Sequence, residues 1–152
     1  MMMSTTSVFV SFRYTEIGIY IDGGDASSGG KQSRRVFVVE DEQIMARTLE
    51  LKLNRSGFEA KSAFDGATAL NILKDEKFDL ILLDLVMPKV DGFAVLSELK
   101  ARGNKTPVIV ISNLGQEEDI ERAKKLGAKE YYVKSYTSVS QIIDHVKETL
   151  NA

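Results

Sequence analysis

Four short apolar runs in this chain each end in polar or charged residues, and this pattern constrains the fold more than any other feature. A short continuous apolar run is typical of a strand buried in a parallel sheet. The runs and the residues that follow them are 36–39 with Glu40 and Asp41, 80–83 with Asp84, 108–111 with Ser112, and 131–133 with Lys134. Ligands of open parallel α/β sheets lie outside the carboxyl ends of the strands. The sequence therefore predicts that three carboxylates, a hydroxyl and an ammonium group meet at one edge of a sheet.

Segments with helical spacing of apolar residues alternate with these runs. The first expected helix covers 43–55, and the others are centred on Leu70, Leu96, Ala123 and Ile143. Residues 58–63 alternate apolar and polar side chains, as an edge strand does. Five strands alternating with five helices, joined by right-handed crossovers, make a doubly wound parallel sheet of the flavodoxin-like α/β class. An edge position for the second strand favours the strand order 2-1-3-4-5.

The first part of the chain has a different character from the rest. Residues 7–12 and 17–21 are β-prone, and residues 22–33 are rich in glycine and serine, as flexible linkers are. We expect residues 1–35 to form an N-terminal extension, either flexible or a loose β-hairpin with a Gly/Ser linker, and residues 36–152 to form one domain. The extension is either an adventitious leader or a pair of strands that docks on a partner.

Composition excludes several classes of site and partner. The chain has 152 residues, no cysteine, one histidine and a net charge of −2. Disulfides and thiolate metal sites are therefore excluded, and no overall positive charge attracts nucleic acid or an anionic membrane. No apolar stretch approaches the roughly 20 residues of a membrane-spanning helix, so we expect a cytoplasmic protein. The single histidine, His145, has no other metal-ligating residue at a suitable spacing and is expected to face solvent.

The acids at the predicted sheet edge indicate a cation site. Glu40, Asp41 and Asp84 end neighbouring strands, so their carboxylates should converge. Two like charges roughly 4 Å apart cost about 4 kcal/mol at an effective dielectric constant near 20. Such a cluster needs a cation, and a set of oxygen ligands alone favours a hard one such as Mg²⁺.

The same edge is suited to phosphoryl transfer. A divalent ion, the Lys134 ammonium and the Ser112 hydroxyl around one carboxylate would stabilise the oxygens of a phosphoryl group. A carboxylate can be the nucleophile and give an aspartyl phosphate. Asp84 is the candidate, because its strand lies between the acid pair and the strands of Ser112 and Lys134. A single aspartate after a strand is more often a cap of a helix or turn than a catalytic residue. Here a purely structural role would have to be assumed independently for the acids, for Ser112 and for Lys134, so their joint placement favours a functional site.

These motifs resemble the receiver domain of bacterial two-component response regulators, of the single-domain chemotaxis type. The resemblance covers 36–152, and the stretches that carry it are 38–42 (VVEDE), 82–92 (LLDLVMPKVDG), 109–112 (IVIS) and 126–134 (LGAKEYYVK). It implies that Asp84 accepts a phosphoryl group from the histidine of a sensor histidine kinase or a histidine phosphotransfer protein. Asp84 and Asp41 would bind Mg²⁺ directly and Glu40 directly or through water, while the backbone carbonyl of Val86 completes the ligands. Lys134 would pair with the phosphoryl oxygens.

The resemblance also implies a switch. Ser112 would contact the phosphoryl oxygens, and the ring of Tyr131 would turn inward as Ser112 moves. The surface of the fourth helix, fifth strand and fifth helix would then change shape for a downstream protein. Because the chain ends after the fifth helix, we expect output through protein binding or phosphorelay.

The chain departs from the family pattern at three positions. Ser135 follows Lys134 where the family has proline, commonly after a cis bond, so we expect either a trans bond with a shifted Lys134 or a strained cis bond. Asn113 replaces a small residue and would narrow access to Asp84 or hydrogen-bond an incoming phosphate. Val86 is apolar and would slow attack of water on the aspartyl phosphate, which predicts a long-lived phospho-form.

Three functions remain open from the residues. The first is a phospho-accepting signalling module that is not a turnover enzyme. The second is a degenerate receiver that binds partners without phosphorylation, which requires Asn113 and Ser135 to be disabling. The third is a phosphatase with an aspartyl nucleophile, like the haloacid-dehalogenase enzymes, which is disfavoured because those need a second acid at the position of Val86.

Overall fold

The protein is described from a computed structural model, which describes residues 14–15, 17–18 and 32–151. The chain divides into two units, Met1–Gln32 and Ser33–Ala152, and each is described by itself. In the first unit β1 (Tyr14–Thr15) pairs with β2 (Ile17–Gly18) in an antiparallel ladder. The predicted strand over 7–12 and nearly all of the predicted linker over 22–33 lie outside the described residues.

The second unit contains a five-stranded parallel sheet in the order β4-β3-β5-β6-β7. Its strands are β3 (Arg35–Val39), β4 (Glu59–Ala63), β5 (Leu80–Leu83), β6 (Val108–Ser112) and β7 (Glu130–Val133). Numbered within this sheet, the order is 2-1-3-4-5, which confirms the prediction. Strand β4 lies at an edge and is mostly half-exposed, whereas β5 and β6 are buried throughout. This difference agrees with the alternation of apolar and polar residues in β4 and with the continuous apolar runs of β5 and β6.

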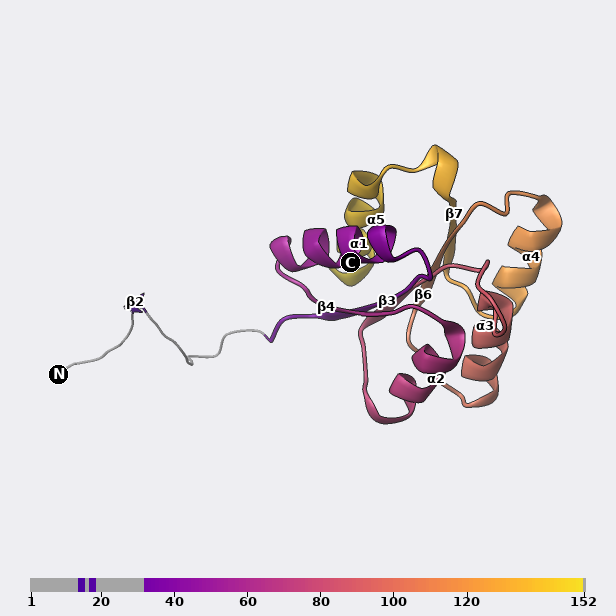
Figure 1. Ribbon diagram of the computed structural model, residues 1–152, viewed down its shortest axis with the longest axis horizontal. Coiled ribbons are helices and arrows are strands. Elements are labelled where there is room, and N and C mark those ends of the chain that lie inside the picture. The colour runs from indigo at the N-terminus through magenta and orange to yellow at the C-terminus, as the bar shows by residue number, and fades with distance from the viewer. Residues whose placement is uncertain (1–13, 16, 19–31, 152) are drawn as a thin grey trace. The chain divides into compact units, whose positions relative to one another are not determined.

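Helices cover both faces of the sheet (Figure 1). They are α1 (Gln43–Arg55), α2 (Gly66–Asp75), α3 (Gly92–Ala101), α4 (Glu117–Lys125) and α5 (Val139–Asn151), and a short 3₁₀ turn, η1 (Lys134–Tyr136), precedes the last. Helices α1 and α5 pack on Val36 and Val38, while α2, α3 and α4 pack on the opposite side with Phe37 and Val39. Alternate residues of one buried strand thus serve the two layers. Among the residues that the structure describes, no helix has the length and apolar character needed to cross a bilayer.

Local signals fix where several helices begin and end. The side chain of Asp65 accepts a hydrogen bond from the backbone N–H of Thr68 at 2.7 Å and so caps the N-terminus of α2. Asp91 caps α3 in the same way through the N–H of Ala94. Gly103, beyond α3, has a φ of +70°, a conformation that favours glycine and ends the helix.

His145 does not face solvent as expected. Its ring stacks on Tyr132 of β7, with ring centroids 4.0 Å apart, and its side chain is half-buried. The sequence-based expectation was wrong because nothing local to α5 indicates which residue of β7 this helix covers.

Candidate functional site

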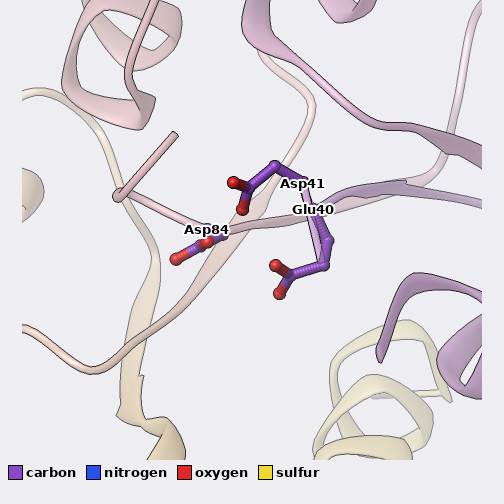
Figure 2. A group of neighbouring side chains, drawn as sticks. All are labelled: Glu40, Asp41 and Asp84. Atoms are coloured by element: carbon purple, nitrogen blue, oxygen red, sulfur yellow. The ribbon is translucent and has the colours of Figure 1, made fainter. Parts of the chain in front are cut away.

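Three carboxylates meet where β3 and β5 end (Figure 2). Val39 and Leu83 are the last paired residues of these strands, so Glu40 and Asp84 follow them side by side. The backbone N–H of Asp84 also donates to the carbonyl of Val39 at 2.9 Å. One oxygen from each of Glu40, Asp41 and Asp84 lies within 4.8 Å of the others. Parallel register therefore brings together the acids that the sequence pointed to.

Lys134 enters this cluster from the end of β7. Its Nζ lies 2.7 Å from Oε1 of Glu40 and 3.5 Å from Oδ2 of Asp84. The side chains of Glu40 and Asp84 are only 4% and 5% exposed, and that of Lys134 is 15% exposed. Because the three charges are largely withdrawn from water, each depends on the others for compensation. Lys134 is held mainly by Glu40 and more loosely by Asp84.

Burial and charge shift the protonation of this group. Burial, and then the charge of Glu40, raise the pKa of Asp84 to about 7, against the opposing charge of Lys134. Burial also acts to lower the pKa of Lys134, but its hydrogen bond to Glu40 and the neighbouring carboxylates outweigh this, and the pKa is raised. The single ammonium therefore stays charged and does not by itself keep Asp84 ionised at neutral pH. A second cation beside Asp84 would do so.

The loop after β5 shapes the mouth of the site. The backbone N–H of Val86 donates to Oδ1 of Asp84 at 3.3 Å, and the Val86 side chain is 54% exposed. Gly92 follows the loop, and a Cβ at this position would lie 2.6 Å from Cα of Leu85 and also against the carbonyl of Asp84. Only glycine permits this close approach of α3 to the loop.

An open pocket of about 330 Å³ lies over the cluster. The acid cluster and Lys134 line it together with Glu42, Val86 and Asn113. No role was assigned to Glu42 from the sequence, although this residue continues the acidic run Glu40-Asp41-Glu42. Its backbone N–H donates to Oε2 of Glu40 at 3.1 Å and helps to orient that carboxylate. Asn113, which was expected from the sequence either to narrow access to Asp84 or to hydrogen-bond an incoming phosphate, is exposed and lines the pocket.

Ser112 and Tyr131 lie beside the pocket rather than at its wall. Ser112 is fully buried, and its Oγ accepts a hydrogen bond from the backbone N–H of Leu114 at 3.2 Å. The half-buried Tyr131 donates its hydroxyl proton to the carbonyl of the same Leu114. Burial raises the pKa of Tyr131, so this hydroxyl keeps its proton. The two predicted switch residues thus contact the same residue of the loop between β6 and α4, Ser112 through the N–H of Leu114 and Tyr131 through its carbonyl.

The donor atoms of the site fit a hard divalent cation. Glu40, Asp41 and Asp84 offer oxygen ligands, which suit Mg²⁺ better than a soft metal. Two of these acids are buried and Asp41 is exposed, so the cluster opens towards solvent, where water can complete an octahedral shell. The part of the Val86 carbonyl as a further ligand stays a prediction.

Comparison with known proteins identifies the family. Residues 36–147 match the family model described as the response regulator receiver domain. The chain belongs to this family. It is 37% identical over 121 residues to the transcriptional regulatory protein PrrA of Mycobacterium tuberculosis, a match that covers 80% of this chain and 52% of PrrA. It is 33% identical over 105 residues to the alkaline phosphatase synthesis transcriptional regulatory protein PhoP of Bacillus subtilis, covering 69% of this chain and 44% of PhoP. The receiver chain thus spans about half the length of these curated relatives.

Solved structures agree with this assignment. The receiver domain of the Francisella response regulator 1452 has a TM-score of 0.72 and 30% identity, over 76% of this chain and 94% of that one. The phosphorylated cyanobacterial phytochrome response regulator RcpA has a TM-score of 0.67 and 32% identity, over 78% of this chain and 91% of that one. Receiver domains act in two-component signalling and generally use Mg²⁺ at an acidic pocket, and this chain has such a pocket.

Proposed function

We propose that this receiver domain accepts a phosphoryl group on Asp84 from the phosphohistidine of a sensor histidine kinase or a histidine phosphotransfer protein. The carboxylate oxygen forms a bond to phosphorus as the bond from phosphorus to the imidazole nitrogen breaks, and the nitrogen keeps the electron pair. The observation that carries the proposal is the position of the buried Asp84 beside the carboxylates of Glu40 and Asp41, 3.5 Å from the Lys134 ammonium and at the wall of an open pocket. The module is a signalling protein with a transient covalent state, and no outside substrate is turned over.

Glu40, Asp41 and Asp84 are the residues that would hold Mg²⁺. A bound ion supplies positive charge that keeps Asp84 ionised and neutralises the phosphoryl oxygens. Lys134 is within reach of Asp84 and would pair with an oxygen of the transferred group, exchanging part of its contact with Glu40. The residues that approach phosphate are thus already gathered before phosphorylation, which lowers the cost of ordering them.

The loop held by Ser112 and Tyr131 is the proposed link to output. A phosphoryl group that draws the Ser112 hydroxyl towards the pocket removes the acceptor of the Leu114 N–H. Tyr131 holds the carbonyl of the same residue, so both contacts respond to one displacement. Tyr131 belongs to β7 and the loop leads into α4, so the change reaches the surface formed by α4, β7 and α5, where a downstream protein binds.

Apolar side chains at the mouth suit a protein donor. Ile44, Val86 and Tyr136 are 83%, 54% and 84% exposed, and each follows within a few residues of a charged residue of the pocket. Single exposed apolar residues are common on protein surfaces, but three that each follow a pocket residue in the sequence can be covered together by one bound protein. We infer that the donor covers them while its phosphohistidine enters the pocket. The module would act in the cytoplasm, where the ATP that charges a histidine kinase is found.

Mass spectrometry after incubation with Mg²⁺ and acetyl phosphate tests the proposal. We expect a gain of one phosphoryl group that is stable in acid and lost in base. The gain is absent from Asp84→Asn and retained by Asp75→Asn, which changes an exposed aspartate at the end of α2. A wild-type protein that gains no mass is a degenerate receiver, and steady release of phosphate from varied phosphate esters would instead make it an enzyme.

A further inference from the structure

The pocket over Asp84 is strongly anionic for a site that receives an anion. Glu40, Asp41, Glu42 and Asp84 all line it, and Lys134 is the one cationic side chain among the residues that the structure shows at its wall. That ammonium is already held at 2.7 Å by Glu40 and at 3.5 Å by Asp84. An incoming phosphoryl group therefore gains from any further hydrogen-bond donor at this wall.

Ser112 does not line this wall. Its side chain is fully buried, and its Oγ accepts a hydrogen bond from the N–H of Leu114. The neighbouring residue differs in both respects. Asn113 is exposed and lines the pocket.

Strand register explains why Asn113 reaches the pocket. Ser112 and Val133 are the last paired residues of β6 and β7, so Asn113 and Lys134 come next on adjacent strands. Both residues line the pocket, and the side chain of Asn113 ends in a carboxamide. A carboxamide offers two N–H donors without charge, so it binds an oxyanion without disturbing the balance between Lys134 and the acids.

We infer that the carboxamide of Asn113 donates a hydrogen bond to the phosphoryl group as it is transferred to Asp84, which makes Asn113 a phosphoryl-binding residue of this chain. The inference rests on the proposed phosphorylation of Asp84. With acetyl phosphate, the Asp84 oxygen bonds to phosphorus while the bond between phosphorus and the acetate oxygen breaks, and acetate leaves with the electron pair. Charge on the peripheral phosphoryl oxygens persists through this step, so a neutral N–H donor at the pocket wall stabilises it.

The rate of mass gain from acetyl phosphate at fixed Mg²⁺ tests the inference in the full chain. Asn113→Ala should slow the second-order rate about tenfold to a hundredfold, the loss expected for one hydrogen bond to a charged group. Asn113→Asp, which keeps the shape but adds a negative charge and removes the donor, should slow it further. Asn71→Ala changes an exposed asparagine of α2 and should leave the rate unchanged.

A second readout follows the side chain itself. The ¹⁵N–¹H signals of the Asn113 carboxamide should shift on phosphorylation, by more than they do with Mg²⁺ alone. An Asn113→Ala rate equal to or faster than the wild-type rate would overturn the inference, and a faster rate would make Asn113 a steric barrier. If the wild type itself gained no mass, the proposed phosphorylation would fail and this inference with it. A phosphorylated wild type with an unchanged carboxamide signal would overturn the inference alone.

Discussion

Asp84 is a buried carboxylate whose ionisation is disfavoured by its surroundings. Its side chain is 5% exposed and its pKa is raised to about 7, against an ordinary value of 3.8. Between these two values the folded state holds a proton that the unfolded state has released. The free energy of unfolding of the metal-free protein therefore falls as the pH rises from about 4 to about 7. The same arrangement that makes Asp84 available for chemistry weakens the fold at neutral pH.

Asp84→Asn should remove this pH-dependent loss of stability, because asparagine does not ionise. In EDTA at pH 8 we expect the variant to be more stable than the wild type by about 1–4 kcal/mol, with a smaller difference at pH 5. Urea unfolding at the two pH values measures the difference. Saturating Mg²⁺ should narrow it by stabilising only the wild type. Equal free energies of unfolding at pH 8 would contradict the raised pKa.

We expect Val86 to control how long a phosphoryl group stays on Asp84. It lines the pocket, and its exposed side chain offers no partner to a water molecule attacking phosphorus. Val86→Asn supplies such a partner and should shorten the half-life of the phospho-form about fivefold, the effect of one neutral hydrogen bond in the transition state. Leu51→Asn is the matched control, since Leu51 is 51% exposed on α1. Equal half-lives for Val86→Asn and the wild type would exclude this role.

At the scale of elements, the loop between β5 and α3 depends on a glycine. A Cβ on Gly92 would meet the backbone of Asp84 and Leu85, which cannot move without displacing the nucleophile. We expect Gly92→Ala to lower the free energy of unfolding by about 1–3 kcal/mol and also to slow phosphorylation. Thermal unfolding and the acetyl phosphate assay measure the two effects.

Gly115 offers a control for this substitution. It lies in the loop between β6 and α4, and a Cβ there would approach Val133 no closer than 3.7 Å, an ordinary contact. Gly115→Ala should therefore leave stability and phosphorylation nearly unchanged. If both variants behaved alike, the close approach at Gly92 would not be the cause.

The elements could be predicted where the signal is local. The bounds of α1, Gln43–Arg55, were predicted as observed, because the spacing of apolar residues is a signal that acts within a few residues. The convergence of Glu40, Asp41 and Asp84 was predicted as well, since it needs only parallel register and the strand order. The parallel register places the acids at the same edge of the sheet, regardless of the conformation of the loops.

Features that depend on how one element packs on another could not be predicted. The position of His145 against Tyr132 is set by how α5 lies on the sheet. The direction of the Ser112 hydroxyl is set by the path of the next loop, where it meets the N–H of Leu114. The position of Glu42 at the pocket could not be predicted for the same reason, because several elements together determine which residues line a pocket.

At the scale of the whole molecule, the second unit has a core of its own. Both apolar clusters draw only on residues between Val36 and Leu150, and the family match spans 36–147. The structural division nevertheless lies before Ser33, slightly earlier than the boundary proposed from the sequence. Two arginines explain this. Nη1 of Arg34 donates to the carbonyl of Leu150 at 2.6 Å, and Arg35 pairs with Glu76 at 2.9 Å while its guanidinium lies over the ring of Phe78.

We therefore expect residues 33–152 alone to unfold at the same temperature as the full chain and to take a phosphoryl group at the same rate. A shorter protein, 36–152, loses both arginine anchors and should be less stable by about 2 kcal/mol, since each anchor is a partly shielded hydrogen bond to a charged group. Differential scanning calorimetry of the three proteins separates these cases. Equal stability of 33–152 and 36–152 would mean that the arginines contribute nothing. A lower unfolding temperature for 33–152 than for the full chain would mean that residues 1–32 support the receiver fold, because the cut leaves every contact of Arg34 and Arg35 in place.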